Sequence, residues 1–409
     1  MKRDYFWNSV GTAVNSFLSL LLLIVVTRIN GLDAAGIFSF GFGFALVFFT
    51  IGLYGGRIYQ VSDIGGEFSS ENYVALKFLT SAIMLVAAGA VILANHYDAY
   101  KSCLILALLL YRISEAIADA FYGVIQKHGR LFIVGISLTC KGGVGFLSFV
   151  VIDAVTKNLL LACLSLVLVN VLFMLAFDRV NVRKSERLAM LADSVKTHLA
   201  NSLRLMKKCA YIFAFSFFAT SIINIPRYFI DIYHEADQGY FGILIMPATL
   251  LSLFVTFIIQ PSVLPLSEMR KNGRYDLFAK STGRMLRVCL ALSAAVIVGV
   301  YLIGVQVLTL IYGVDLTPYR LELTGVMLGG SFNVVASIYS NVLVIIRRQF
   351  AQLIVFIFSL ALVAILCAVF VNTYGIAGGI LSYIIANAVQ GGLFIIVYKV
   401  IMKKERAAR

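Results

Sequence analysis

Long apolar stretches alternate with short polar stretches along the chain. Apolar runs such as Phe17–Val26 and Leu353–Val371 are continuous, which favours membrane helices over the alternating strands of a barrel. Windows of about twenty apolar residues, the length that crosses a bilayer, predict twelve spans in this sequence. They lie at residues 7–27, 35–56, 74–94, 102–124, 131–152, 158–177, 210–231, 239–264, 285–312, 320–345, 350–371 and 376–398. The pattern therefore predicts an all-α integral membrane protein with about twelve transmembrane helices.

The composition agrees with a fold inside a bilayer. Hydrophobic residues make up 61% of the chain and charged residues 13%. Soluble domains are nearer to half apolar and about a quarter charged, so a water-soluble protein of this size would lack surface charge. In a membrane, lipid tails are the solvent for most of the surface, and an apolar exterior is favoured.

Basic residues gather in the loops on one side of the predicted spans. If the N-terminus is cytoplasmic and residues at the ends of spans are counted with the adjoining loops, 27 of the 34 lysines and arginines lie on the cytoplasmic side, Arg57 and Lys77 among them. Four lie outside, and three lie deep within spans. This asymmetry explains the net charge of +14 without nucleic acid as a partner. The positive-inside rule predicts that both termini are cytoplasmic.

The longest polar loop divides the spans into two groups of six. This division predicts an N-terminal six-helix lobe at 1–178, a cytoplasmic basic linker at 179–209 and a C-terminal six-helix lobe at 210–409. Within the linker, Leu188–Met206 is expected to be helical. Either this helix is amphipathic and lies at the membrane interface, or it is a plain solvated helix.

The two halves share a weak internal repeat. Gly36–Ser39 (GIFS) opens the second span of the first half, and Gly239–Gly242 (GYFG) opens the second span of the second half. An even number of spans in each half gives both copies the same orientation in the membrane. Together with the equal division of spans, the repeat predicts two six-helix lobes around a central cavity.

Three charged residues lie on one face of the fourth span. Arg112, Glu115 and Asp119 are separated by three and four positions, so their side chains project from the same side of a helix. A charge at the centre of a bilayer costs about 2.5–3.5 kcal/mol or more, so each of these residues is a functional candidate. Glu115 and Asp119 are candidates for proton or sodium coupling. The alternative for Arg112 and Glu115 is a structural pair in which each neutralises the other.

Two further cations fall within predicted spans. Lys141 in the fifth span has no acidic residue within one turn of its own helix, which favours a role in a cavity. Arg227 in the seventh span follows Pro226, and Asp231 lies one turn later. A structural pair with Asp231 is therefore the alternative to a binding role for Arg227.

Amide side chains form a second group of candidates. Asn15, Asn224, Asn333 and Asn387 lie within spans and could contact the hydroxyl groups of sugars, although hydrogen bonds between helices are the alternative. The cysteines and histidines are scattered and form no metal-binding motif, so we expect no metal and no cofactor.

The absence of several sequence motifs disfavours some classes of membrane protein. The sequence has no GxxxxGK[ST] phosphate-binding loop, so the chain does not hydrolyse ATP by that device. It also has no potassium-filter sequence and no arginine ladder, which disfavours a channel or voltage sensor. A membrane polysaccharide polymerase would be expected to have a long outer loop, and no such loop is predicted. The remaining class is a carrier, so we expect that the chain is not an enzyme.

The chain resembles a known family of carriers. The twelve spans, their six-and-six division, the start of the second span at Gly36–Ser39 and the junction from Asn224–Asp231 to Gly239–Gly242 are similar to the polysaccharide flippases of the Wzx type. These flippases belong to the multidrug/oligosaccharidyl-lipid/polysaccharide exporter superfamily. Many of its members have fourteen spans, whereas this chain has twelve predicted spans.

The resemblance implies a function. Such flippases move an undecaprenyl-pyrophosphate-linked oligosaccharide from the cytoplasmic to the outer face of the bacterial plasma membrane. The products supply O-antigen, capsule or teichoic-acid-like polymers, and the implied partners are the lipid-linked substrate, membrane lipids and polysaccharide polymerase machinery. Cations in the central cavity are a feature of the family, and Arg112, Lys141 and Arg227 are the residues here that could match them.

Three other functions stay open from the sequence. A multidrug or cation exporter of the same superfamily would need an acidic and aromatic binding site, whereas the excess charge within the predicted spans is basic. A membrane polysaccharide polymerase is disfavoured by the short outer loops. A purely structural assembly partner is the third alternative.

Overall fold

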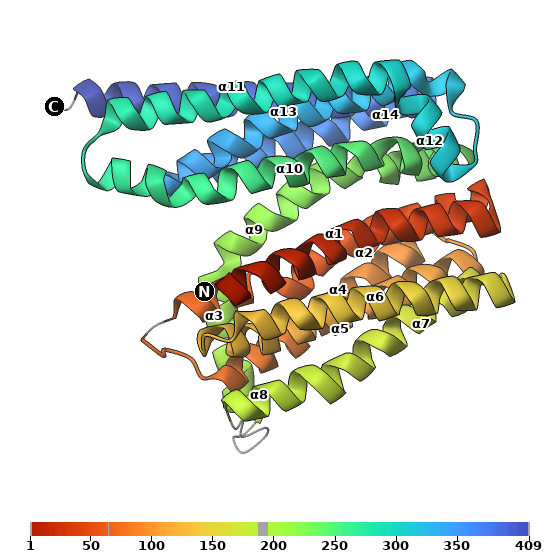
Figure 1. Cartoon of the computed structure of the whole chain (residues 1–409), viewed down its shortest axis with the longest axis horizontal. Helices are drawn as coiled ribbons and strands as arrows, with labels where there is room; N and C mark the ends of the chain where they lie inside the picture. The colour runs from red at the N-terminus through yellow and green to blue at the C-terminus, as the bar shows by residue number, and fades with distance from the viewer. Residues whose placement is uncertain (1, 64, 187–194, 408–409) are drawn as a thin grey trace. The chain divides into compact units, whose positions relative to one another are not determined.

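The computed structural model of the protein describes residues 2–63, 65–186 and 195–407. This part of the chain is almost entirely helical and contains no strand. Its helices form two compact units, Met1–Thr220 and Ser221–Arg409, which Figure 1 shows with their helices labelled. The predicted all-α fold is confirmed.

Unit 1 begins with α1 and ends within α9, which continues into unit 2. The elements are α1 (Lys2–Asn30), α2 (Leu32–Leu53), α3 (Gly56–Ser62), α4 (Ser70–Ala94), α5 (Ala99–Lys127), α6 (Leu131–Thr156), α7 (Leu159–Phe173), a π-helical turn (Met174–Asp178), α8 (Arg179–Ser185) and α9 (Val195–Tyr233). Part of the predicted linker helix Leu188–Met206, residues 188–194, lies outside the described residues. The rest of it is the first part of α9, which runs on into the seventh predicted span.

Unit 2 follows α9 and contains the other long helices. They are α10 (Gln238–Lys271), α11 (Tyr275–Gly299), a π-helical turn (Val300–Gly304), α12 (Val305–Tyr312), α13 (Arg320–Ile345) and α14 (Gln349–Ala407), with short 3₁₀ turns at Glu235–Asp237 and Thr317–Tyr319. The helix α14 is interrupted at Gly375, whose backbone has φ 53° and ψ −129°. This break falls between the last two predicted spans.

The predicted number of spans agrees with the helices. Nine segments of the described chain are long and apolar enough to cross a membrane, and one of them, Gln349–Lys404, has 56 residues. That length is enough for two spans, one on each side of Gly375. The helices α5 and α10, with 29 and 34 residues, are also long enough to cross. About twelve spans are therefore confirmed.

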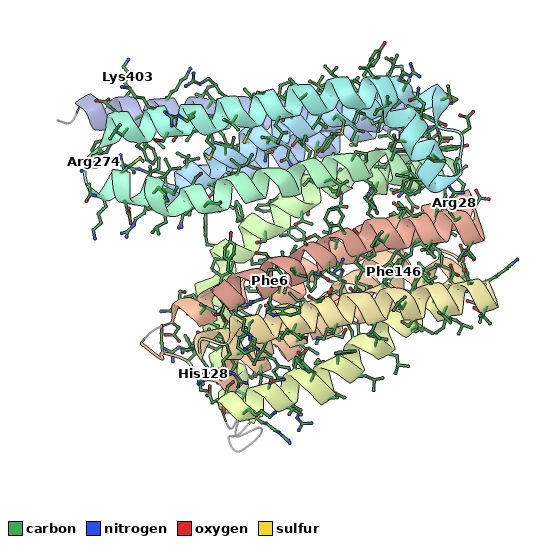
Figure 2. All side chains as sticks on the ribbon, viewed as in Figure 1. Phe6, Arg28, His128, Phe146, Arg274 and Lys403 are labelled. Carbon is green, nitrogen blue, oxygen red and sulfur yellow. The ribbon has the colours of Figure 1, made fainter. Side chains whose placement is uncertain are left out.

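The ends of the helices follow the predicted alternation within each unit. Figure 2 shows Phe6 and His128 at one end of unit 1 and Arg28 at the other end. It also shows Arg274 and Lys403 at one end of unit 2. Loops that the charge count assigns to the same side of the membrane thus lie at the same end of their unit.

The helix α5 occupies the centre of unit 1. It contacts α2, α3, α4, α6, α7 and α8, so most of its side chains are shielded from lipid. Its first turn is capped by Asp98, whose carboxylate accepts a hydrogen bond from the backbone N–H of Lys101 at 2.9 Å. Because α5 is also the most charged of the predicted spans, its central place determines where the charges meet.

A break after α2 brings a short polar helix into the same region. Tyr54 and Gly55 both have a left-handed backbone, with φ 46° and 66°, and α3 starts at Gly56. The ring of Tyr54 stacks on Phe213 of α9 with the ring centroids 4.4 Å apart. The second predicted span thus ends earlier than expected, and α3 supplies side chains, including that of Arg57, to the interior of unit 1.

Candidate functional site

Charged side chains from five elements converge in the interior of unit 1. We call them the charged cluster: Arg57 from α3, Lys77 from α4, Arg112, Glu115 and Asp119 from α5, Lys141 from α6 and Asp178 from the π-helical turn. Arg112, Glu115, Asp119 and Lys141 lie within predicted spans, whereas Arg57, Lys77 and Asp178 lie at or next to the ends of predicted spans. The cluster holds four cations and three carboxylates, and each carboxylate lies within ion-pair distance of a cation.

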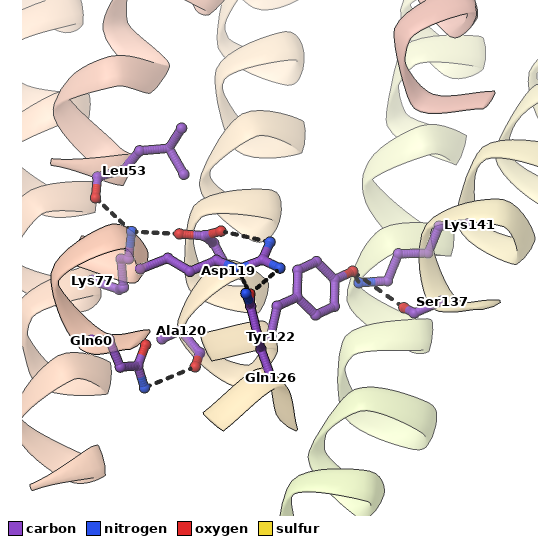
Figure 3. A network of polar contacts seen from close by, with 10 residues as sticks. Leu53, Gln60, Lys77, Asp119, Ala120, Tyr122, Gln126, Ser137 and Lys141 are labelled. Carbon is purple, nitrogen blue, oxygen red and sulfur yellow. Dashed lines mark hydrogen bonds and ion pairs between the residues drawn. The ribbon is translucent and has the colours of Figure 1, made fainter. Parts of the chain in front are cut away.

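The first part of the charged cluster is built around Asp119 (Figure 3). Its carboxylate lies 2.9 Å from Lys77 Nζ and 3.5 Å from a guanidinium nitrogen of Arg57. Lys77 also donates to the carbonyl oxygen of Leu53 at 2.6 Å, at the last residue of α2. Arg57 donates to Gln126 Oε1 at 2.8 and 3.1 Å. The bond from Lys77 satisfies a carbonyl that the end of α2 leaves without a helical partner.

The second part joins α6 to the end of α7. Lys141 Nζ lies 2.5 Å from the Asp178 carboxylate and donates to the Tyr122 hydroxyl at 2.8 Å. Ser137 donates to the other Asp178 oxygen at 2.6 Å. Asp178 is fully buried and Lys141 is 6% exposed. A buried ion pair is stable only when further hydrogen bonds satisfy its atoms, and this pair has them.

The third part is local to α5. Arg112 pairs with Glu115 at 2.5 Å, and Glu115 also accepts a hydrogen bond from the Tyr111 hydroxyl at 3.2 Å. The Arg112 guanidinium carbon lies 4.6 Å from the centre of the Phe42 ring and 5.2 Å from that of Phe49. Arg112 is therefore held by a carboxylate on one side and by aromatic faces on the others.

A cavity of about 200 Å³ lies among these groups, within unit 1. Its lining is mixed: apolar side chains from α2 and α6, phenols from α5, two amides, two cations and two carboxylates. The lining residues are Asn15, Phe49, Leu53, Arg57, Tyr111, Glu115, Asp119, Tyr122, Leu138, Lys141, Gly142 and Asn170. Cavities that bind drug-sized molecules are mostly apolar, with few polar groups. This cavity has several charged and amide groups among its apolar and aromatic ones, so it suits a ligand with both polar and apolar faces.

The structure brings several predicted site residues together. Asn15, Glu115, Asp119 and Lys141 line the cavity, and Arg112 lies behind Glu115. The alternative of a structural pair is observed for Arg112 and Glu115. Lys141 also has a carboxylate partner, although not on its own helix. Packing places this partner, Asp178 of the π-helical turn, against Lys141.

Other predicted site residues lie in unit 2. Arg227 and Asp231 of α9 are both buried, and the Arg227 carbonyl accepts a hydrogen bond from Gln238 at 3.2 Å. Asn387 is fully buried, and its amide donates to the carbonyl of Tyr383 one turn earlier at 2.8 Å. Asn224 and Asn333 are partly buried. Binding roles for these residues stay predictions.

Four residues that make ion pairs or hydrogen bonds in the charged cluster are among those not predicted from the sequence. They are Arg57, Lys77, Tyr122 and Asp178. The charge count places Arg57 and Lys77 among the loop cations because they lie near predicted span ends. Asp178 follows the sixth predicted span directly. A search for oppositely charged residues at the same depth of neighbouring spans could identify such residues.

Among the described residues, no group of three or more histidine, cysteine or acidic side chains is suited to a metal ion.

Known proteins similar to this chain are membrane-transport and polysaccharide proteins. No family profile matches the chain. The capsular polysaccharide biosynthesis protein CapF of Staphylococcus aureus is 21% identical over 319 residues, which cover 76% of this chain and 78% of that protein. The lipid II flippase MurJ in an inward closed conformation matches with a TM-score of 0.73 and 14% identity, over 96% of this chain and 87% of its own.

A third match is a multidrug resistance transporter of the MATE family in an inward-facing conformation. Its TM-score is 0.67 at 12% identity, and the match covers 98% of this chain and 99% of the transporter. At such low identities the solved structures show the fold. The resemblance predicted from the sequence is confirmed in these terms: the chain is a multi-pass membrane protein with the fold of the transporters of the MOP superfamily.

Proposed function

We propose that the protein is a flippase that moves an undecaprenyl-pyrophosphate-linked oligosaccharide from the cytoplasmic to the outer face of a bacterial plasma membrane. The observation that carries this proposal is the cavity of unit 1, which lies among membrane-spanning helices and is lined by charged, amide and phenol groups as well as apolar ones. Polar groups within a bilayer are costly to bury, so a cavity lined by them marks a path for a polar cargo. A sugar chain is such a cargo, while its polyprenyl tail can stay in lipid.

Two of the similar proteins support a substrate of this class. The relative from Staphylococcus aureus is described as a capsular polysaccharide biosynthesis protein, and MurJ is described as a lipid II flippase. Both descriptions concern cell-surface polymers or their lipid-linked precursors. We therefore favour surface polysaccharide synthesis, with polymerase machinery as the downstream partner, over other kinds of transport.

The pyrophosphate of the substrate needs a cation. We propose Arg227 for this role, because it is buried in the membrane-spanning part of α9 and guanidinium groups can bind phosphate oxygens in pairs. We further propose that the ion pairs of Arg112 and Lys141 in unit 1 hold the cavity in shape.

The direction of transport follows from charge. Because the cytoplasm is electrically negative relative to the outside, the outward movement of an anion is favoured by about 2.3 kcal/mol per charge for each 100 mV. A pyrophosphate diester with two charges would gain roughly 4–5 kcal/mol. The membrane potential could then drive export without a coupled ion.

A multidrug or cation exporter is the second candidate. Glu115 and Asp119 line the cavity beside Phe49, Tyr111 and Tyr122, and acidic and aromatic side chains together suit an organic cation. The fold is also that of a multidrug resistance transporter. In the present structure, however, both carboxylates already have cationic partners.

A reconstituted system separates the two candidates. The purified chain is placed in liposomes with undecaprenyl-pyrophosphate-oligosaccharide that carries a fluorophore on its sugar, and an impermeant reductant measures how much substrate reaches the outer leaflet. We expect fast loss of fluorescence from both leaflets with the protein, and loss from the outer leaflet alone without it. Efflux of a fluorescent organic cation, with no movement of the lipid substrate, would instead establish the exporter.

Substitutions of arginine test the assigned cation. Arg227→Met should slow flipping by at least about tenfold, since a charge-assisted phosphate contact contributes roughly 1.5–3 kcal/mol. Arg227→Lys should retain part of the rate. The matched control is Arg348→Met, which removes an exposed loop cation and should not change the rate. Equal rates in all variants would exclude Arg227 from the transport path.

Ion coupling is tested with the carboxylates. In the same liposomes, Glu115→Gln and Asp119→Asn are combined, and flipping is measured with and without an imposed proton or sodium gradient. If either carboxylate couples transport to an ion, the double variant should no longer respond to the gradient. An unchanged response would remove both residues as coupling sites.

A further inference from the structure

We infer that the cavity of unit 1 binds one glycosyl unit of the substrate and does not bind its pyrophosphate. This inference rests on the proposed function and assigns one part of the substrate to one site. Three features of the cavity support it: the charge balance around it, its size and the chemistry of its lining.

Three of the charged groups that line the cavity are each paired with an opposite charge that is not part of the lining. Lys141 is paired with Asp178, Glu115 with Arg112, and Asp119 with Lys77. Asp119 also pairs with Arg57, whose guanidinium nitrogen lies 3.5 Å from its carboxylate. Arg57 otherwise donates hydrogen bonds to the neutral amide of Gln126. The charged cluster as a whole therefore has an excess of one positive charge.

This balance disfavours a pyrophosphate in the cavity. A diphosphate diester brings two negative charges, which the single excess positive charge cannot match. A buried charge without a partner is strongly unfavourable, and separating an existing pair such as Lys141 and Asp178 would leave another one. A neutral sugar, or a sugar with a single carboxylate near Arg57, leaves the charges balanced.

The size of the cavity fits one sugar ring. Its volume of about 200 Å³ is smaller than the roughly 300–1,000 Å³ of sites for drug-sized ligands. A whole oligosaccharide repeat would not fit. A single ring could enter while the rest of the repeat remains outside the cavity.

The lining offers what a sugar needs. Phe49, Tyr111 and Tyr122 line the cavity, and the C–H groups of a pyranose can pack against aromatic rings. Asn15 and Asn170 supply amide donors and acceptors for hydroxyl groups. Carboxylates that are fixed by cations, as Glu115 and Asp119 are, accept hydroxyl hydrogen bonds without having to move.

The test measures binding of free ligands to the full-length purified protein in detergent. Saturation-transfer difference NMR is recorded with neutral hexoses, N-acetylhexosamines and hexuronates. Phosphorus line widths are recorded with inorganic pyrophosphate. We expect binding of at least one class of monosaccharide to the unchanged protein.

Matched variants locate the binding site. Leu138→Trp fills the cavity from α6 and should abolish the sugar signal, whereas Leu147→Trp alters an exposed residue of the same helix and should leave it unchanged. Asn15→Leu keeps the shape of the side chain but removes its amide, and should weaken sugar binding by about tenfold. Because Asn15→Leu is nearly isosteric, it remains informative if Leu138→Trp does not fold.

Two results would overturn the inference. One is that no monosaccharide binds, or that the sugar signal is the same in Asn15→Leu and Leu138→Trp as in the unchanged protein. The other is that pyrophosphate binds and Leu138→Trp removes it. Flipping in liposomes is measured separately, so intact flipping without sugar binding at the cavity rejects this inference alone. Sugar binding without flipping rejects only the proposed function.

Discussion

Lys141 of α6 and Asp178 of the π-helical turn form a buried ion pair in unit 1, with their charged atoms 2.5 Å apart. The turn Met174–Asp178 interrupts the regular helix between α7 and α8, and such π-helical segments occur often at functional sites. Ser137 and Tyr122 complete the hydrogen bonding of the pair. One ion pair thus connects the wall of the cavity to an irregular helical segment.

Removing one partner of this pair should destabilise the protein strongly. Lys141→Met leaves the Asp178 carboxylate buried without a counter-charge, which costs about 3–5 kcal/mol in comparable cases. The double variant Lys141→Met/Asp178→Leu removes both charges and should be much closer to the original stability. Thermal unfolding of the purified proteins in detergent measures the difference. If the double variant is no more stable than Lys141→Met, the pair does not determine the stability of this region.

A carboxylate in the loop after α3 should give a pH-dependent contribution to stability. Burial opposes the charge of Asp63, but hydrogen bonds from the backbone N–H groups of Glu67 and Phe68 and from the Tyr73 hydroxyl outweigh it and lower the pKa of Asp63. A lowered pKa stabilises the fold at a pH above the unfolded-state value of about 3.9, and this stabilisation is lost as the pH falls through the folded-state pKa.

Comparison of Asp63→Asn with the unchanged protein tests this contribution. The difference in melting temperature between the two proteins should be constant from about pH 8 to about pH 5, because Asp63 is ionised in both the folded and the unfolded state there. It should shrink below about pH 4, near the reference pKa of about 3.9. Glu67→Gln is the control, since the Glu67 side chain is exposed and pairs with Lys208 at the surface. A difference that does not depend on pH would mean that the charge of Asp63 is not involved.

The spans could be predicted because each helix must present about twenty apolar residues to lipid, which leaves a strong local signal. The break of the last helix at Gly375 is predicted for the same reason, since two such windows lie one after the other. The left-handed Tyr54 at the end of α2 is not predicted. The glycine that follows it, Gly55, is a weak signal, because glycine within a span also allows two helices to pack closely without any break.

The charged cluster could be predicted only in part, because its pairs join distant segments. Arg112 and Glu115 are three positions apart, so their pairing follows from helix geometry. Asp178 is 37 positions after Lys141, and Asp119 is 42 after Lys77. Which helices pack together decides such pairs, and the spacing along the chain contains no information about it.

A single exposed residue tests a strained helix end. Lys157 follows α6 and has a left-handed backbone with φ 48°, a conformation that costs most residues roughly 1–2 kcal/mol and glycine almost nothing. Lys157→Gly should therefore raise the stability by up to about 1 kcal/mol. Lys157→Ala is the control, because it removes the charge but keeps the strain. If both variants change the melting temperature equally, the backbone is not the cause.

The contact between α1 and α6 depends on glycine at one position and not at another close by. A Cβ atom at Gly135 would overlap the carbonyl group of Trp7 in α1, and a backbone group cannot move aside as a flexible side chain can. At Gly143, two turns further along α6, a Cβ atom would have no neighbour within 4 Å.

Gly135→Ala should consequently destabilise the protein by about 1–3 kcal/mol, the usual cost of overpacking, and should move α1 away from α6. Gly143→Ala should stabilise it slightly, because alanine in a helix is favoured over glycine by up to about 1 kcal/mol. Melting temperatures in detergent give both signs in one experiment.

Since Asn15 of α1 and Lys141 of α6 both line the cavity, Gly135→Ala should also weaken sugar binding there, and Gly143→Ala should not. Equal effects of the two substitutions would mean that α1 can yield at this contact, and that close packing of α1 on α6 does not set the shape of the cavity.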